Sequence, residues 1–277
     1  MRNVLEDFLV DEERLIVNAN GEVPLVYWPV TPNFGDDMSQ WLMEKLTSKR
    51  VVRAAEGEPC YVAIGSIINR VTNEAQVWGT GSFGPEPPRQ VNPRATYHAV
   101  RGPLTRARVL DRGRECPRVY GDPALLAPLF FQDNIPKDAD IGIAIRWSDD
   151  DWKKLDVGSG IKLIDFGTSD VEGTLRELLS CKKIITSSLH GLIIADTYGI
   201  PSAWLSSTTP KGGEFKFYDY FLSVDKVRHT YEVRLQDIEL TVEALETHFN
   251  FDARPINFDP RELLGACPFL KAAPSNP

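Results

Sequence analysis

Short apolar runs separated by glycine, proline and small polar residues recur along most of this chain. Apolar runs bounded in this way are typical of buried strands, and apolar residues spaced three or four apart are typical of helices. We predict strands at residues 24–30, 61–64, 77–78, 97–100, 141–145, 162–166, 184–186 and 203–205, and one ending near 119–123. We predict helices at residues 38–46, 103–110, 124–129, 171–181, 192–198, 234–249 and 260–264. This alternation indicates an α/β protein with parallel sheets.

The alternation is interrupted once, by a polar, proline-containing segment at residues 131–140. Such segments are common at domain boundaries, and 277 residues are enough for two domains of ordinary size. We therefore predict one domain over residues 1–135 and a second over residues 136–277. The second domain is expected to end in a short helix and a disordered tail at residues 272–277.

Net charge, hydrophobicity and cysteine spacing argue against several classes of protein and site. The net charge is −8 and no dense basic block is present, which argues against nucleic acid as the main partner. No apolar run is long enough to cross a bilayer, and no secretory signal is recognisable. Four widely spaced cysteines form no C-x-x-C pair, so we expect reduced thiols, no zinc site and a cytoplasmic location.

The strongest candidate for chemistry is the turn at residues 187–191, Ser-Ser-Leu-His-Gly. It lies between the predicted strand 184–186 and the predicted helix 192–198. A turn from a strand into a helix directs free backbone N–H groups and partial positive charge to one place, where anions bind readily. In the structural interpretation, a serine merely caps the helix and His190 is an ordinary surface residue.

Other polar residues follow predicted strands in the first half. Asn33, Asp36 and Asp37 precede the helix at 38–46, where they act either as helix caps or as groups facing a ligand at the sheet edge. Trp78 leads into Gly79-Thr80-Gly81, which lacks the third glycine of a dinucleotide fingerprint. Arg101 either binds an anion or anchors a neighbouring loop.

Two basic residues stand out in the second half. Arg146 ends the predicted strand at 141–145. Lys216 lies in residues 211–220, where paired glycines, two lysines and interleaved aromatic residues favour a flexible loop that closes on an anionic or sugar ligand.

In combination, these motifs resemble the polysaccharide pyruvyl transferase family. They are most similar to members that decorate bacterial exopolysaccharides such as xanthan and succinoglycan. The resemblance covers roughly residues 25–225, and it rests on the order and spacing of several short motifs. The motifs lie at residues 33–36, 64–66, 77–81, 100–103, 119–126, 187–193, 198–201 and 215–220.

The resemblance implies two Rossmann-like domains facing a cleft, similar to the GT-B arrangement of glycosyltransferases, with the acceptor on the first and the donor on the second. It implies transfer of the enolpyruvyl group of phosphoenolpyruvate to a sugar, giving a pyruvate ketal and phosphate without a cofactor or metal. The implied acceptor is an exopolysaccharide sugar on a lipid-linked oligosaccharide at the inner face of the cytoplasmic membrane. With no spanning segment expected, any membrane association would be peripheral.

The resemblance also suggests roles for individual residues. His190 is the expected catalytic acid and Asp36 the expected base. The donor site is expected to include Arg146, Ser187, Ser188, Leu189 and Lys216, and the acceptor side or cleft Asn33, Trp78, Gly79, Thr80, Gly81 and Arg101. Other branches of the family have arginine at the position of Ser188, so the main cation for the donor is left unassigned.

Two other functions fit the same pattern. A glycosyltransferase that uses a nucleotide sugar would share the fold, although Glu232 and Glu239, the acidic pair available to hold a ribose, lie beyond the motif region. A non-catalytic scaffold of a polysaccharide assembly complex is the other alternative, but His190 and Asp36 are both present. Binding of phosphoenolpyruvate separates the first alternative from pyruvyl transfer, and turnover separates the second.

Overall fold

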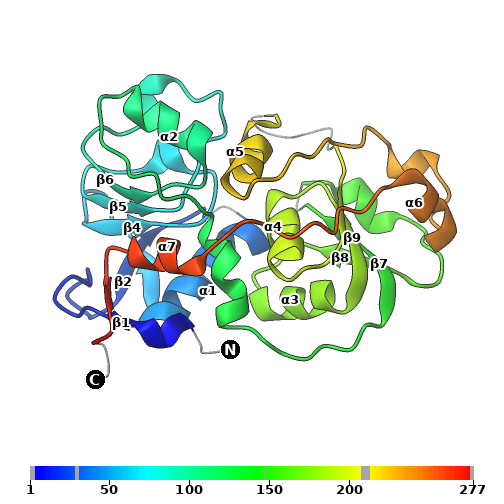
Figure 1. The fold of residues 1–277 in the computed structure, drawn as a ribbon, viewed down its shortest axis with the longest axis horizontal. Coiled ribbons are helices and arrows are strands. Elements are labelled where there is room, and N and C mark those ends of the chain that lie inside the picture. The colour runs from blue at the N-terminus through cyan, green and yellow to red at the C-terminus, as the bar shows by residue number, and fades with distance from the viewer. Residues whose placement is uncertain (1–3, 29–30, 147, 207–212, 275–277) are drawn as a thin grey trace.

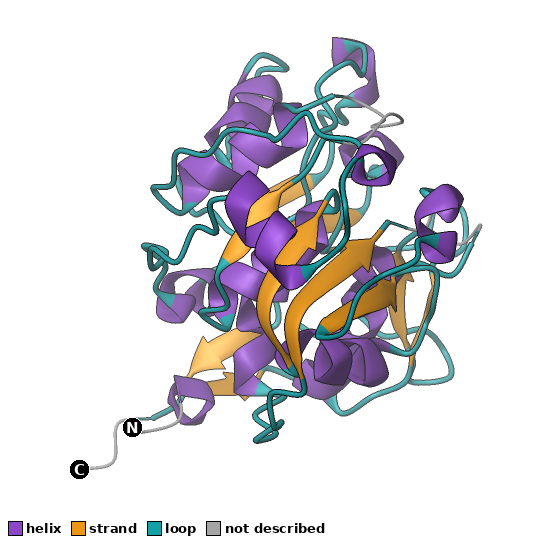
Figure 2. Ribbon diagram, turned by 90° about the vertical axis from the view of Figure 1, so that its right-hand side faces the viewer, coloured by secondary structure: helices purple, strands orange, loops and turns teal. Residues whose placement is uncertain are grey.

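The computed structural model describes residues 4–28, 31–146, 148–206 and 213–274. Two parallel sheets form its centre, and they confirm the predicted α/β class with parallel strands. In Figure 1 one sheet lies on the left and the other on the right, and Figure 2 shows helices on either side of the strands.

The first sheet has five strands in the order β3-β2-β4-β5-β6. Its members are β2 (Val23–Val26), β3 (Val51–Arg53), β4 (Cys60–Val62), β5 (Ala75–Trp78) and β6 (Thr96–Ala99). The second sheet has four strands in the order β10-β9-β7-β8. Its members are β7 (Ala139–Ile145), β8 (Ile161–Asp165), β9 (Cys181–Thr186) and β10 (Ser202–Trp204). Nearly every residue of β4, β7 and β10 is buried, as expected for strands covered on both faces.

Seven α-helices are found within the described residues. They are α1 (Phe34–Thr47), α2 (Pro103–Leu110), α3 (Val171–Leu179), α4 (Leu189–Thr197), α5 (Phe215–Ser223), α6 (Val242–His248) and α7 (Pro260–Gly265). A 3₁₀ helix, η4 (Pro123–Leu129), packs on both α1 and α4, so one hydrophobic core runs from the first sheet to the second. No helix of the described ranges is long and apolar enough to cross a membrane.

The C-terminal segment returns to the first half of the chain (Figure 1). Strand β11 (Leu270–Ala272) pairs antiparallel with β1 (Phe8–Val10), and the Trp78 indole donates a hydrogen bond to the Leu263 carbonyl at 2.8 Å. The division of the chain at residues 135 and 136 itself stays a prediction. Ala272, predicted to begin a disordered tail, lies in β11, and residues 275–277 lie outside the described residues.

Two predicted elements are wrong. The expected helix at 234–249 is only α6, preceded by the 3₁₀ turn Leu235–Asp237 and irregular chain. The expected strand near 119–123 is reduced to a single bridge between Val100 and Tyr120. The strand predicted at 24–30 ends at Val26, and residues 29–30 lie outside the described residues.

The predicted flexible loop at 211–220 is also wrong over its second half, which forms helix α5. Phe217, Tyr220, Phe221 and Val224 follow helical spacing and are buried, and the Phe217 ring stacks on Trp204 with centroids 4.6 Å apart. The aromatic residues therefore build a packed helix rather than a mobile surface. Residues 211–212 of that prediction lie outside the described residues.

Candidate active site at the junction of the two sheets

The predicted turn from strand to helix is present at the end of β9. Helix α4 begins at Leu189, three residues before the predicted start, so His190 lies in its first turn. The Ser188 backbone N–H donates to Thr186 Oγ1 at 3.0 Å, which closes the turn. A side chain at Gly191 would collide with Thr186, so glycine is required here. Leu189 is 4% exposed, and its side chain belongs to the core, so only its backbone is available to a donor.

His190 joins the two halves of the molecule. Its Nε2 lies 3.6 Å from Oδ2 of Asp122, the residue that caps η4. Its Nδ1 lies against the backbone of Gly35 at the start of α1, where an added Cβ would overlap the imidazole ring. The side chain of His190 is 11% exposed and that of Asp122 is fully buried.

Asp36 follows the glycine that His190 contacts. Its Oδ2 accepts a hydrogen bond from Asn33 Nδ2 at 2.6 Å, and Asn33 also caps α1 through its side chain. Burial raises the pKa of Asp36, and the neighbouring charges of His190 and Lys216 oppose this shift. The structure thus brings together the two residues predicted as acid and base, while their roles stay predictions.

Lys216, in the first turn of α5, is a buried cation. Burial lowers its pKa to about 7, with the charges of Arg146 and Arg101 acting in the same direction and those of Asp36 and Asp149 against it. Its Nζ lies 5.8 Å from the centroid of the Phe83 ring and 5.2 Å from that of Phe217. None of the described residues forms a hydrogen bond or ion pair with this ammonium group.

Arg146 and Ser187 meet at a second buried carboxylate, Asp149. Ser187 Oγ donates to Asp149 Oδ2 at 2.9 Å, and Arg146 Nη2 lies 3.8 Å from Asp149 Oδ1. Arg146 Nε donates to the Ser148 hydroxyl at 2.8 Å, and burial lowers the pKa of the guanidinium. The predicted donor residues Arg146, Ser187 and Lys216 therefore gather where strands of the second sheet end.

Most of the residues predicted for the acceptor side stabilise the local fold through buried contacts. Gly79 has a φ of 101° and contacts Pro123, where a side chain would collide with the proline ring. Thr80 is fully buried and its hydroxyl donates to the Gly65 carbonyl at 2.7 Å, while the Gly81 N–H donates to the same oxygen at 3.0 Å. These three residues fix the end of β5 instead of presenting polar groups.

The side chains of Trp78 and Arg101 are also buried. The Trp78 indole is 1% exposed and packs against Phe269 under α7, which argues against the predicted contact with an acceptor. Arg101 is fully buried, and its guanidinium donates to Asp219 Oδ2 at 3.0 Å, Ser66 Oγ at 2.6 Å and the Ser82 carbonyl at 2.6 Å. Of the two alternatives left open for Arg101, the anchor is the one that the contacts favour.

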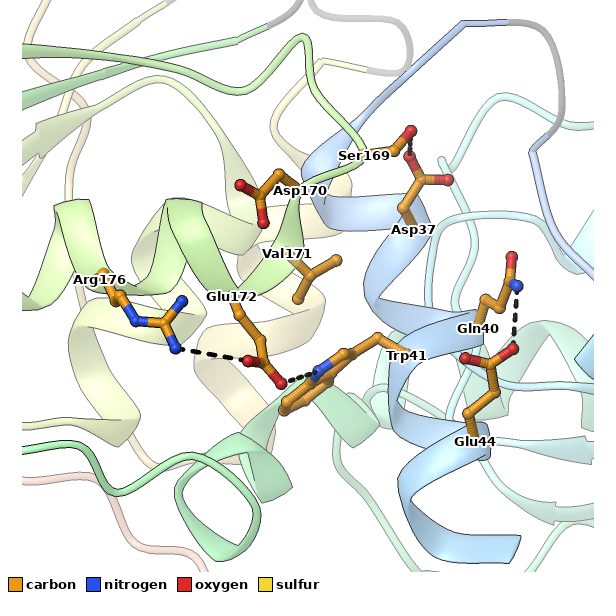
Figure 3. Close-up of a pocket in the computed structure, with 9 residues that line it drawn as sticks. All are labelled: Asp37, Gln40, Trp41, Glu44, Ser169, Asp170, Val171, Glu172 and Arg176. Carbon is orange, nitrogen blue, oxygen red and sulfur yellow. Dashed lines mark hydrogen bonds and ion pairs between the residues drawn. The ribbon is translucent and has the colours of Figure 1, made fainter. Parts of the chain in front are cut away.

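A hollow of about 490 Å³ lies between α1 and α3, apart from His190. Figure 3 shows its lining side chains paired with one another: Ser169 with Asp37, Gln40 with Glu44, and Glu172 with both Trp41 and Arg176. Paired groups of this kind hold the helices together, so we assign the chemistry to the His190 region. No cluster of three metal-binding side chains occurs in the described part of the chain.

Sequence reasoning missed the closeness of Asp122 to His190. Asp122 caps η4, since its Oδ1 accepts from the Ala124 N–H at 3.1 Å. Its second oxygen faces a residue 68 positions along the chain, and no local pattern signals that contact.

Part of the chain matches a known family, and similar proteins are found over most of its length. Residues 82–209 match the polysaccharide pyruvyl transferase family. An uncharacterized protein of Acanthamoeba polyphaga mimivirus is 29% identical over 212 residues, 72% of this chain and 73% of the relative. The succinoglycan biosynthesis protein ExoV of Rhizobium meliloti is 26% identical over 223 residues, 77% of this chain and 67% of the relative. A solved structure of an uncharacterized protein from Klebsiella pneumoniae aligns with a TM-score of 0.46 and 12% identity, covering 72% of this chain and 87% of that one.

Proposed function

Since residues 82–209 belong to the polysaccharide pyruvyl transferase family, which implies a transferase enzyme, we propose that the protein transfers the enolpyruvyl group of phosphoenolpyruvate to a polysaccharide sugar. The products are a pyruvate ketal and phosphate. The observation that carries this proposal is the buried ammonium of Lys216, which has no carboxylate partner among the described residues. Asp36 lies close enough to feel the charges of both Lys216 and His190.

The donor carries a phosphate and a carboxylate, so its site needs cations and N–H groups. Lys216 and Arg146 supply the positive charge in this proposal, and the start of α4 with Ser187 and Ser188 supplies hydroxyl and backbone contacts. A buried lysine with a lowered pKa regains its proton when an anion arrives, because the new negative charge favours the ammonium form.

Transfer then proceeds in two additions to C2 of the donor. His190 gives a proton to C3, and a sugar hydroxyl attacks C2 while its own proton passes to Asp36. A second hydroxyl then attacks C2 as the C2–O bond to phosphate breaks, which closes the ketal ring, and the proton of this hydroxyl returns to His190. The preorganised cations stabilise the negative charge of the departing phosphate.

The finer features of the fold and the acceptor belong to the same proposal. We assign the two sheets to a GT-B-like pair of Rossmann-like units, with the donor held mainly by the second. We take the acceptor to be a lipid-linked oligosaccharide at the inner face of the cytoplasmic membrane, reached by peripheral association.

The test combines donor binding with turnover. Phosphoenolpyruvate at a hundredfold over its dissociation constant should stabilise the folded protein by about 2.7 kcal/mol, seen as a rise in melting temperature. His190→Gln should keep this rise but lose phosphate release in the presence of oligosaccharide acceptors. His248→Gln, at an exposed position in α6, serves as the control and should match the unaltered protein. Stabilisation by nucleotide sugars instead of phosphoenolpyruvate would contradict the proposal.

A further inference from the structure

Two buried polar atoms without partners face each other in the site. His190 Nε2 and Asp122 Oδ2 are among the few buried side-chain atoms that lack a hydrogen bond within the described residues, and they lie 3.6 Å apart. Buried polar atoms nearly always find a partner, so this pair calls for an explanation. In a ligand-free enzyme, functional hydrogen bonds are often long and shorten when substrate arrives.

The position of Asp122 is fixed from its other side. Its Oδ1 caps η4 by accepting from the Ala124 N–H at 3.1 Å, and Pro123 packs into the space left open by Gly79. The carboxylate cannot turn away without losing the cap. Its second oxygen is therefore held toward the ring of His190 before any substrate binds.

A fixed carboxylate of this kind selects one form of a neutral imidazole. A neutral histidine carries a single N–H, and a carboxylate only accepts, so the proton belongs on the nitrogen that faces it. We propose that Asp122 is a positioning residue that keeps His190 in its Nε2–H form, which leaves Nδ1 as the atom that exchanges protons with the substrate.

The surroundings of the ring agree with this assignment. Nε2 is fully buried, so the exposed fraction of His190 lies elsewhere on the residue. Nδ1 lies on the side of Gly35, next to Asp36.

This inference rests on the proposed function for its chemical step. The proton leaves Nδ1 of the imidazolium, and the electron pair of the C2–C3 double bond forms the new bond from C3 to hydrogen. C2 is left with positive charge for attack by the sugar hydroxyl. The imidazole becomes neutral with its remaining proton on Nε2, still facing Asp122, so no proton passes to the carboxylate.

Asp122→Asn tests the pairing directly. The amide oxygen can keep the cap on Ala124, which turns the amide nitrogen toward His190. That nitrogen is a donor, so Nε2 must accept and the ring proton moves to Nδ1. Ring-nitrogen chemical shifts of 15N-histidine-labelled protein, recorded well above the usual imidazole pKa, report which form is present. The spectrum of His190→Gln identifies the signals of His190.

We expect the Nε2–H form in the unaltered protein and the Nδ1–H form in Asp122→Asn. Turnover should fall about a hundredfold or more, because the imidazolium needs a proton on Nε2 as well, and that N–H would face the amide N–H of the variant, while the thermal shift with phosphoenolpyruvate is retained. Asp259→Asn is the control: Asp259 caps α7 through the Arg261 N–H at 2.9 Å and also precedes a proline, but it is exposed. It should change neither readout.

An Nδ1–H form in the unaltered protein would overturn the inference, even if Asp122→Asn fails to fold. An unchanged form or unchanged turnover in folded Asp122→Asn would also overturn it. The spectra need no substrate, so a failed pairing is distinguishable from a failed donor assignment, in which phosphoenolpyruvate gives neither a thermal shift nor phosphate.

Discussion

Two buried cations, Arg101 and Lys216, have opposite surroundings. Arg101 is surrounded by acceptors: a carboxylate, a hydroxyl and a carbonyl each take one of its N–H groups. Lys216 lies beside aromatic rings and is offered no hydrogen bond by the described residues. A buried cation whose N–H groups are all accepted by the protein has a structural role, whereas a buried cation without a hydrogen-bonding partner is available to an anionic ligand.

Arg101 and Lys216 are also linked through helix α5. Asp219, the partner of Arg101, lies three residues after Lys216 on α5 and also accepts from the backbone and hydroxyl of Thr105 on α2. Arg101 therefore fixes the helix that presents Lys216.

The largest effect is expected from Arg101→Leu. It leaves the fully buried Asp219 without its counterion, which should cost about 3–5 kcal/mol of unfolding free energy. Urea unfolding measures this loss. Arg234→Leu removes an exposed ion pair to Asp237 and should leave the unfolding midpoint where it is. Equal unfolding midpoints for Arg101→Leu and Arg234→Leu would contradict the structural role of Arg101.

Lys216→Met should weaken binding while sparing the fold. Removing the ammonium should raise the dissociation constant for phosphoenolpyruvate tenfold to a hundredfold, about 1.4–2.7 kcal/mol, because a charge-assisted contact to the anion is lost. Titration calorimetry gives the constant. Lys183→Met, at a surface residue paired with Glu246, is the control. Unchanged affinity in Lys216→Met would remove this residue from the donor site.

A third difference concerns the pH dependence of stability. The pKa of Lys216 is lowered from 10.5 to about 7, so between these values the unfolded chain binds more protons at this residue than the folded protein does. The penalty for burying the ammonium is complete below pH 7 and is relieved as the pH rises toward 10.5. Stability contributed by Lys216 therefore increases with pH, by at most about 1.4 kcal/mol per unit.

Urea unfolding of the unaltered protein and Lys216→Met at several pH values between 7 and 9 tests this expectation. The stability advantage of the variant should shrink as the pH rises. A difference that stays constant over the range would show that Lys216 keeps the same charge in both states.

The parts that sequence predicts best are local. Apolar runs correctly predict that β9 leads through a turn into α4, because each signal acts within a few residues, although both elements begin three residues earlier than predicted. Helix α5 was missed because a run of aromatic residues was interpreted by its composition and not by its spacing. Phe217, Tyr220 and Val224 are three and four residues apart, a spacing that is typical of one face of a helix and that indicates α5.

Contacts between distant segments are the parts that sequence could not provide. The pairing of β1 with β11 joins residues almost a full chain length apart, and the Trp78–Leu263 contact joins residues 185 positions apart. The same holds within the site: Asp122 carries a cap signal that is visible locally, and its approach to His190 is visible only after folding. Residue types thus identify candidates, and tertiary packing separates side chains with structural contacts from those that are available to a ligand.

The return of the C-terminal segment has a consequence for biosynthesis. Leu263, which accepts from the Trp78 indole, is translated 185 residues later. At the usual rates of synthesis it leaves the ribosome roughly 10–40 s after Trp78 does. Throughout that interval Tyr61 and Trp78 lack the Phe269 ring that covers them in the finished fold. The nascent first half is therefore exposed to premature association, and chaperones that shield apolar surface should raise the yield of native protein most during this window.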